Sequence, residues 1–298
     1  MKKIKDLQGC GTALVTPFKA NGKLDEEGLR KLVDFQVSEG IDFLVPCGTT
    51  GENPTLTLEE HLRVVEIVVE QSRGKVPIIA GAGGYNTAKV IEMASKVADL
   101  GVDGLLSVTP YYNKPTQEGL YQHYKRIANK IKIPLIIYNV PSRTGINILP
   151  QTVARVYKEC KNVVGIKEAS GSLDQITKLM SLVDRKFVLL SGSDEITLPI
   201  LSVGGVGVIS VLANIMPSQT HNLVDSFLKD DIDKARKLQV HLYKLIKMLF
   251  IETNPIPVKT ALGLMGLIKP YLRLPLYRMS KENEVKLKAT LREYRIIR

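Results

Sequence analysis

Residues 163–170 read VVGIKEAS, a short apolar run that ends in a lysine and a glutamate. Runs of this kind, rich in β-branched residues and bounded by a glycine or a turn, are typical of strands buried on both faces. Seven further segments share the pattern and predict eight strands in all. They are TALVTPF (12–18), DFLVP (42–46), VPIIAG (76–81), GLLSVTP (104–110), PLIIYNV (134–140), FVLLSGS (187–193) and GVGVISV (205–211).

The segments between these runs predict helices. Most strand starts lie 24 to 34 residues apart, which suits a parallel strand followed by its crossover helix. Thr57 with Glu60, and Ser172 with Gln175, have the spacing of capping boxes, and residues 29–37 carry an apolar stripe of helical period. Repeated βα units of this kind predict an α/β protein with a (β/α)8 barrel, the TIM-barrel fold.

The chain is longer than the barrel requires, because 87 of its 298 residues follow residue 211. One more helix completes a barrel, so the surplus predicts a C-terminal helical appendage. We expect a catalytic barrel at 1–224 and the appendage, packed on it, at 225–298. The segment NPIPVK at 254–259 predicts a break between the appendage's helices.

Composition excludes several classes of protein. Of the net charge of +11, the segment from Lys269 to the end supplies 9 − 3 = +6, and no nucleic-acid-binding motif accompanies it. Residues 196–220 are uncharged but broken by prolines and glycines, so we expect no membrane span. Cys10, Cys47 and Cys160 are widely separated and predict reduced thiols. With no apolar leader, the chain is predicted to be cytoplasmic.

Lys167 is the first candidate for chemistry. Side chains alternate along a strand, so Lys167 shares a face with Gly165. On an inward, buried face, loss of solvation lowers the pKa of an amine, and a fall of about 2 to 3 units from about 10.4 leaves a usable neutral fraction near pH 8. A neutral buried amine can attack a ketone to form a Schiff base. The alternative is an ordinary lysine that reaches solvent or pairs with Glu168.

Other polar groups follow the carboxyl ends of the predicted strands, where (β/α)8 barrels hold their active sites. GTTGE (48–52) offers hydroxyls and backbone N–H groups for a carboxylate, or it is a plain turn. Tyr138 could move a proton if Thr49 or Thr50 completes a relay, or it caps the barrel interior. Arg143 could bind a substrate carboxylate through two hydrogen bonds, or it is solvated. No metal-binding, nucleotide-binding or G-x-S-x-G motif is present, so no metal or cofactor is predicted.

Five motifs together resemble a known family. They are GTTGE (48–52), TPYYNKPTQEGLYQHY (109–124), YNVPSRTG (138–145), GIKEASG (165–171) and GVISV (207–211). The set is similar to the pyruvate-dependent class I lyases and, within them, to the dihydrodipicolinate synthases of lysine and diaminopimelate biosynthesis. The resemblance implies an enzyme, a lyase that condenses pyruvate with L-aspartate 4-semialdehyde to give 4-hydroxy-tetrahydrodipicolinate. It also implies a homo-oligomer, a dimer or a dimer of dimers.

The resemblance also implies roles for particular residues. Lys167 would form the Schiff base, Tyr138 would donate and accept protons, and Thr49 would link Tyr138 to Tyr112, which reaches in from a neighbouring subunit. The substrate-binding residues would be Thr50, Ile209 and Gly192 for pyruvate and Arg143 for the carboxylate of the semialdehyde.

Two alternatives remain open. One is a related aldolase, an N-acetylneuraminate lyase or a 2-keto-3-deoxy sugar acid aldolase, which shares GTTGE and the barrel lysine. Arg143 is the residue that disfavours a sugar-acid aldolase. The other is a catalytically dead barrel that acts as a binding or regulatory protein. A barrel isomerase that binds phosphate is disfavoured, because no glycine-rich loop opens a helix after strand 7.

One position departs from the family pattern. The resemblance implies that lysine-inhibited relatives bind free lysine at a subunit interface, through an acidic residue early in the helix after strand 3. Here Lys89 stands at that position, and Tyr85 and Leu58 replace other polar contacts, whereas His61 and Tyr111 still match. A cation facing a cation is repulsive, so we expect free lysine not to inhibit this protein.

Overall fold

The computed structural model describes Ile4 and residues 7–298. Eight parallel strands form one sheet in the order β2-β1-β8-β7-β6-β5-β4-β3. A parallel bridge between Leu44 and Ile78 joins the two outer strands, so the sheet closes into a barrel. The strands are β1 (Gly9–Ala13), β2 (Phe43–Val45), β3 (Ile79–Gly81), β4 (Gly104–Val108), β5 (Leu135–Asn139), β6 (Val163–Glu168), β7 (Val188–Ser191) and β8 (Gly207–Ser210).

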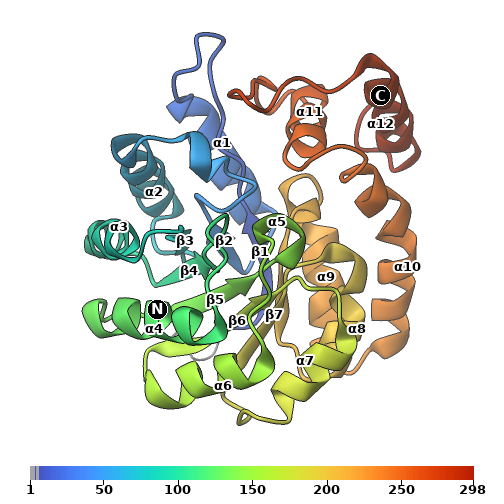
Figure 1. Ribbon diagram of the computed structural model, residues 1–298. Coiled ribbons are helices and arrows are strands. Elements are labelled where there is room, and N and C mark those ends of the chain that lie inside the picture. The colour runs from blue at the N-terminus through green and yellow to red at the C-terminus, as the bar shows by residue number, and fades with distance from the viewer. Residues whose placement is uncertain (1–3, 5–6) are drawn as a thin grey trace.

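Helices surround the strands, and Figure 1 shows the C-terminal helices, in orange and red, gathered on one side of the barrel. The helices that alternate with strands are α1 (Glu26–Ser38), α2 (Leu58–Ser72), α3 (Thr87–Asp99), α4 (Gln117–Lys130), α5 (Pro141–Thr144), α6 (Pro150–Glu159), α7 (Leu173–Met180), α8 (Thr197–Ser202) and α9 (Pro217–Leu228). The appendage consists of α10 (Ile232–Met248), α11 (Ile256–Leu264) and α12 (Lys281–Glu293). The predicted (β/α)8 barrel with a C-terminal helical appendage is confirmed.

Two apolar clusters follow from the alternation of side chains along the strands. Ile136, Tyr138 and Leu190 belong to a cluster inside the barrel, whereas Ile137 and Ile166 belong to the cluster between the strands and the helices. Burial on both faces explains why the strands read as continuous apolar runs. The inner cluster ends near the carboxyl ends of the strands, where polar side chains take over.

Several local expectations need correction. The first strand is Gly9–Ala13 and not residues 12–18, because only this segment pairs with β2 and β8, while the apolar residues after it are a buried loop. Thr57 and Glu60 form the expected capping box. Ser172 does cap α7, but the side chain of Gln175 bonds Asn147, so the second box is incomplete.

The appendage begins within the expected region. The predicted boundary between residues 224 and 225 lies inside α9, which packs on β1 as the barrel's last helix, and the division into two units stays a prediction. The break between α10 and α11 covers residues 249–255, and Ile256–Lys259 are already helical, so NPIPVK only begins in it.

The apolar region 196–220 contains α8, β8 and the start of α9 instead of one long helix. Among the described residues no helix has the length and apolar character needed to cross a membrane. The three cysteines are free and buried, as predicted.

Candidate active site

A cavity of about 270 Å³ opens at the carboxyl ends of the strands. Six of the eight predicted catalytic and substrate-binding residues line it: Thr49, Thr50, Tyr138, Arg143, Lys167 and Gly192. They come from loops and strands that are far apart in the sequence, and the closed barrel brings them together. Ile209 lies outside this lining, in the apolar cluster inside the barrel.

Lys167 points into the barrel, which settles the choice that alternation along the strand had left open. It pairs in register with Tyr138 on β5 and with Leu190 on β7, two residues of the inner cluster, and its side chain is 6% exposed. Burial lowers the pKa of the Lys167 ammonium to about 8, opposed by the nearby Asp194 carboxylate and assisted by the charge of Arg143. An appreciable fraction of the amine is therefore neutral near physiological pH.

Tyr138 lies directly beside this amine. The Nζ atom of Lys167 is 4.3 Å from the centre of the Tyr138 ring. Burial raises the pKa of the Tyr138 phenol, while the charge of Arg143 and a hydrogen bond with Thr49 oppose the rise. Contact with Thr49 gives the phenol a route for its proton, which a general acid and base requires.

Gly192 leaves room for the lysine. A Cβ atom at Gly192 would lie 3.1 Å from Cε of Lys167 and 2.7 Å from Cβ of Ala169. The backbone N–H of Gly192 donates to Glu168 O at 2.7 Å. A larger residue here would push against the Lys167 side chain.

Arg143 stands at the mouth of the cavity. Its Nη2 atom donates to the backbone oxygen of Asn254 at 3.3 Å, and the side chain is otherwise exposed. The guanidinium is therefore free to meet an anionic group of an incoming molecule.

Tyr112 does not join this site within one chain. Its side chain is 89% exposed, and its backbone has a φ of 66°, in the left-handed region that non-glycine residues rarely adopt. The relay from Tyr138 through Thr49 therefore stops at Thr49 in the single subunit.

Among the residues that line the cavity or act on it and that the sequence analysis did not name are Asp194, Glu195, Phe250 and Asn254. Asp194 is buried, accepts hydrogen bonds from the N–H groups of Val211 and Leu212, and acts electrostatically on Lys167. Asp194 and Glu195 directly follow the predicted strand 187–193, so their place at the carboxyl end of a strand was a signal that could have found them. No local pattern marks Phe250 and Asn254, which lie beyond the eight strands.

A second buried lysine has a different environment. Lys259 of α11 is fully buried, and its Nζ atom donates to Glu52 Oε1 at 2.6 Å and to Thr16 O at 2.9 Å. Burial lowers the pKa of Lys259 to about 8, opposed by Glu52. Because Lys259 is paired and does not line the cavity, it is a structural residue.

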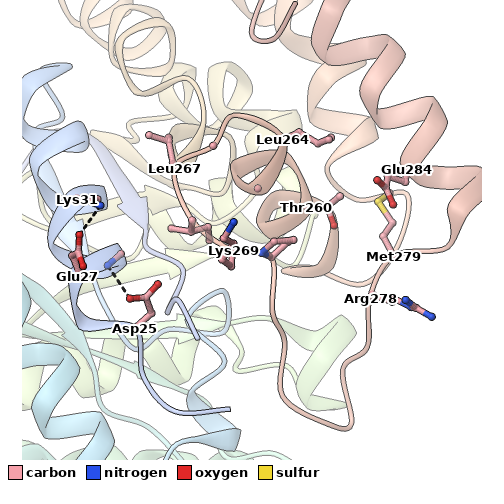
Figure 2. Close-up of a pocket in the computed structure, with 15 residues that line it drawn as sticks. Asp25, Glu27, Lys31, Thr260, Leu264, Leu267, Lys269, Arg278, Met279 and Glu284 are labelled. Atoms are coloured by element: carbon pink, nitrogen blue, oxygen red, sulfur yellow. Dashed lines mark hydrogen bonds and ion pairs between the residues drawn. The ribbon is translucent and has the colours of Figure 1, made fainter. Parts of the chain in front are cut away.

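A wider cavity of about 550 Å³ lies between α1 and the C-terminal segments (Figure 2). Its lining includes Lys31, which pairs with Glu27 at 2.7 Å, and also Lys269 and Arg278. None of the predicted site residues contributes to it. The predicted site residues therefore gather at the narrower cavity around Lys167 and not here.

No group of three or more histidine, cysteine, aspartate or glutamate residues that could hold a metal ion occurs in the part of the chain that the structure describes.

A closed (β/α)8 barrel with a buried, partly neutral lysine beside a tyrosine defines the class of Schiff-base-forming lyases. The family model described as the dihydrodipicolinate synthetase family matches residues 6–294, and this chain belongs to that family.

Known relatives agree over almost the whole chain. The 4-hydroxy-tetrahydrodipicolinate synthase of Geobacter sulfurreducens is 53% identical over 290 residues, 97% of this chain and 99% of the relative. The crystal structure of dihydrodipicolinate synthase from Aquifex aeolicus superimposes with a TM-score of 0.96 at 45% identity, covering 97% of this chain and 99% of the other. The structure of the Acinetobacter baumannii enzyme complexed with pyruvate superimposes with a TM-score of 0.95 at 42% identity, covering 97% of this chain and 99% of the other. The resemblance inferred from the five motifs is confirmed.

The altered pKa of Lys167 leads to a prediction about pH. Only the neutral amine attacks a ketone, so the rate of adduct formation with pyruvate should rise about tenfold per pH unit up to about pH 8 and then level off. The Asp194→Asn substitution removes a charge that favours the ammonium form of Lys167, so the pH at which the rate levels off should be lower in this variant. Rapid-quench borohydride trapping measures the rate, and a rate independent of pH between 6 and 9 would contradict the assignment.

Proposed function

We propose that this protein catalyses the condensation of pyruvate with L-aspartate 4-semialdehyde to 4-hydroxy-tetrahydrodipicolinate, as a step of lysine and diaminopimelate biosynthesis. The observation that carries the proposal is the buried Lys167 amine beside Tyr138, in a cavity with Arg143 at its mouth. The family and the names of the relatives support the choice of substrates. The predicted cytoplasmic location stays part of the proposal.

The proposed steps use side chains of this cavity. The neutral Lys167 amine attacks C2 of pyruvate, and loss of one water gives an imine. Loss of a proton from the methyl carbon gives an enamine, whose carbon attacks the aldehyde carbon of the second substrate. The amine of that substrate then attacks C2 and displaces Lys167, closing the ring and regenerating the free lysine. Tyr138 donates and accepts the protons, with Thr49 as its partner.

The substrate-binding roles are proposed from position. Thr50 and the space beside Gly192 receive the carboxylate end of pyruvate. The role of the Ile209 backbone at this end rests on the family resemblance, because Ile209 belongs to the inner apolar cluster and does not line the cavity. Arg143, exposed at the mouth, binds the carboxylate of the semialdehyde. A sugar-acid aldolase would need hydroxyl-binding groups at this position, so Arg143 favours the semialdehyde.

The proposal is tested by turnover of pyruvate with each candidate aldehyde. We expect product only with the semialdehyde and none with N-acetylmannosamine or glyceraldehyde.

Arg143→Ala should leave the pyruvate adduct intact and weaken binding of the semialdehyde by roughly 2 to 4 kcal/mol, because a charged partner of its carboxylate is lost. Tyr138→Phe should slow turnover about 100-fold or more. Loss of pyruvate binding in Arg143→Ala would show that the roles are wrongly assigned.

Tyr112 leads to a second prediction, about assembly. Its exposed side chain fits a shared site, in which a neighbouring copy completes the relay, so the protein should be a homodimer or a dimer of dimers. Tyr112→Phe and Tyr138→Phe should each be nearly inactive alone. When the two are co-expressed, hybrid dimers contain one intact site, and about a quarter of the activity should return. No recovery in hybrids verified by native mass spectrometry, or full activity in a monomer, would refute the shared site.

The third prediction concerns free lysine. Lys89, Tyr85, Leu58 and His61 all line one cavity of about 400 Å³. Glu92 lies there too, but it pairs with Lys96 at 2.8 Å. Burial lowers the pKa of His61 to about 4, so this histidine is neutral. Because Lys96 neutralises Glu92, the charge of Lys89 is left unbalanced in this cavity and disfavours a cationic amino acid.

Initial rates with 0 to about 10 mM free lysine at saturating pyruvate should not fall. The Lys89→Glu substitution replaces the repulsive charge by an attractive one and should create measurable inhibition. Half-inhibition of the unmodified protein below about 1 mM would refute the prediction.

A further inference from the structure

Asn254 connects the appendage to two of the four predicted substrate-binding residues, Thr50 and Arg143. It lies in the segment between α10 and α11, is 5% exposed and lines the same cavity as Lys167. Its side-chain Nδ2 donates to Thr50 Oγ1 at 2.9 Å, across 204 positions of sequence. Its backbone oxygen accepts from Arg143 at 3.3 Å.

The hydrogen bond to Thr50 has a direction that matters. A threonine hydroxyl has one proton to donate and two lone pairs to accept with. Because Asn254 donates to a lone pair, the proton of Thr50 is left for another acceptor, and no described residue accepts it. Pyruvate presents a carboxylate, which only accepts hydrogen bonds. The amide of Asn254 thus leaves Thr50 as a donor toward the cavity.

The surrounding contacts fix this arrangement. Glu52, two residues after Thr50, is held by Lys259 of α11 at 2.6 Å and by the backbone N–H of Arg273 at 3.1 Å. The other amide atom, Oδ1 of Asn254, is buried and has no hydrogen-bond partner among the described residues. The bond to Thr50 is therefore the one hydrogen bond that the Asn254 side chain makes with the described residues.

We infer that Asn254 is a positioning residue for pyruvate: its amide holds the Thr50 hydroxyl as a hydrogen-bond donor to the pyruvate carboxylate. This inference rests on the proposed function. A substitution of the side chain leaves the backbone contact with Arg143 in place, so the effect should fall on pyruvate and not on the semialdehyde.

The test is a double-mutant cycle with Asn254→Ala and Thr50→Val. The pyruvate concentration that half-saturates borohydride trapping at Lys167 is measured for the wild type, both single variants and the double variant. Asn254→Ala should raise it about 3- to 10-fold, and the double variant should match Thr50→Val alone, because Asn254 acts through the hydroxyl. The KM for the semialdehyde in Asn254→Ala should stay within about threefold. Additive losses, or an unchanged pyruvate requirement in Asn254→Ala, would overturn the inference.

Asn254→Asp provides a second variant that keeps the size of the side chain. An ionised carboxylate accepts the Thr50 proton, so the hydroxyl turns its lone pairs toward pyruvate. This variant should need about tenfold more pyruvate than Asn254→Ala, the reverse of the order expected from size alone. When Thr50→Val is also present, the difference in half-saturating pyruvate concentration between Asn254→Asp and Asn254→Ala should be smaller, because only charge repulsion remains. Wild-type pyruvate binding by Asn254→Asp would show that Thr50 donates to residue 254, and the inference would fail.

Different results would refute the proposed function and the role of Asn254. A wild-type protein that forms no pyruvate adduct would overturn the proposed function and this inference together. An active wild type whose variants give additive losses would overturn the inference alone. Thermal unfolding midpoints within a few degrees of the wild type show that the variants are folded.

Discussion

The loss of solvation around one amine determines how this site is built. Lys167 must be buried for its pKa to fall, yet it must remain open to a ketone. The barrel meets both needs, because β5 and β7 pack on either side of β6 while the carboxyl ends of the strands stay open. Gly192 leaves space beside the side chain, and Asp194 limits the fall of the pKa.

The appendage is part of this construction. The buried ion pair of Lys259 with Glu52 fixes the end of the loop that carries Thr49 and Thr50. Such a pair contributes little net stability, because desolvating both charges offsets their attraction, but it defines one geometry. Asn254, in the segment between α10 and α11, adds a direct contact from the appendage to Thr50. Helices outside the barrel thus position groups inside its active site.

Much of this could be predicted from the sequence, because local periodicity reports burial. Eight apolar runs predicted eight strands, and alternation along one of them placed Lys167 on the face of Gly165, although it did not show that this face is the inner one. The first strand was misplaced, because an apolar run does not show which part of it finds a pairing partner. Asn254 was missed for a related reason: its contact with Thr50 spans 204 positions of sequence, and no local pattern records it. Asp194 could have been found, because it directly follows the predicted strand 187–193.

The central claim is that one particular buried lysine is the nucleophile, and the protein contains a natural comparison. Lys167 and Lys259 are both buried and both have a pKa lowered to about 8, but only Lys167 lines the cavity. Incubation with pyruvate and borohydride, followed by peptide mass mapping, distinguishes them most directly. The account predicts one reduced pyruvate adduct per chain, on Lys167, and none on Lys259. An adduct on Lys259, or no adduct on either lysine, would contradict it.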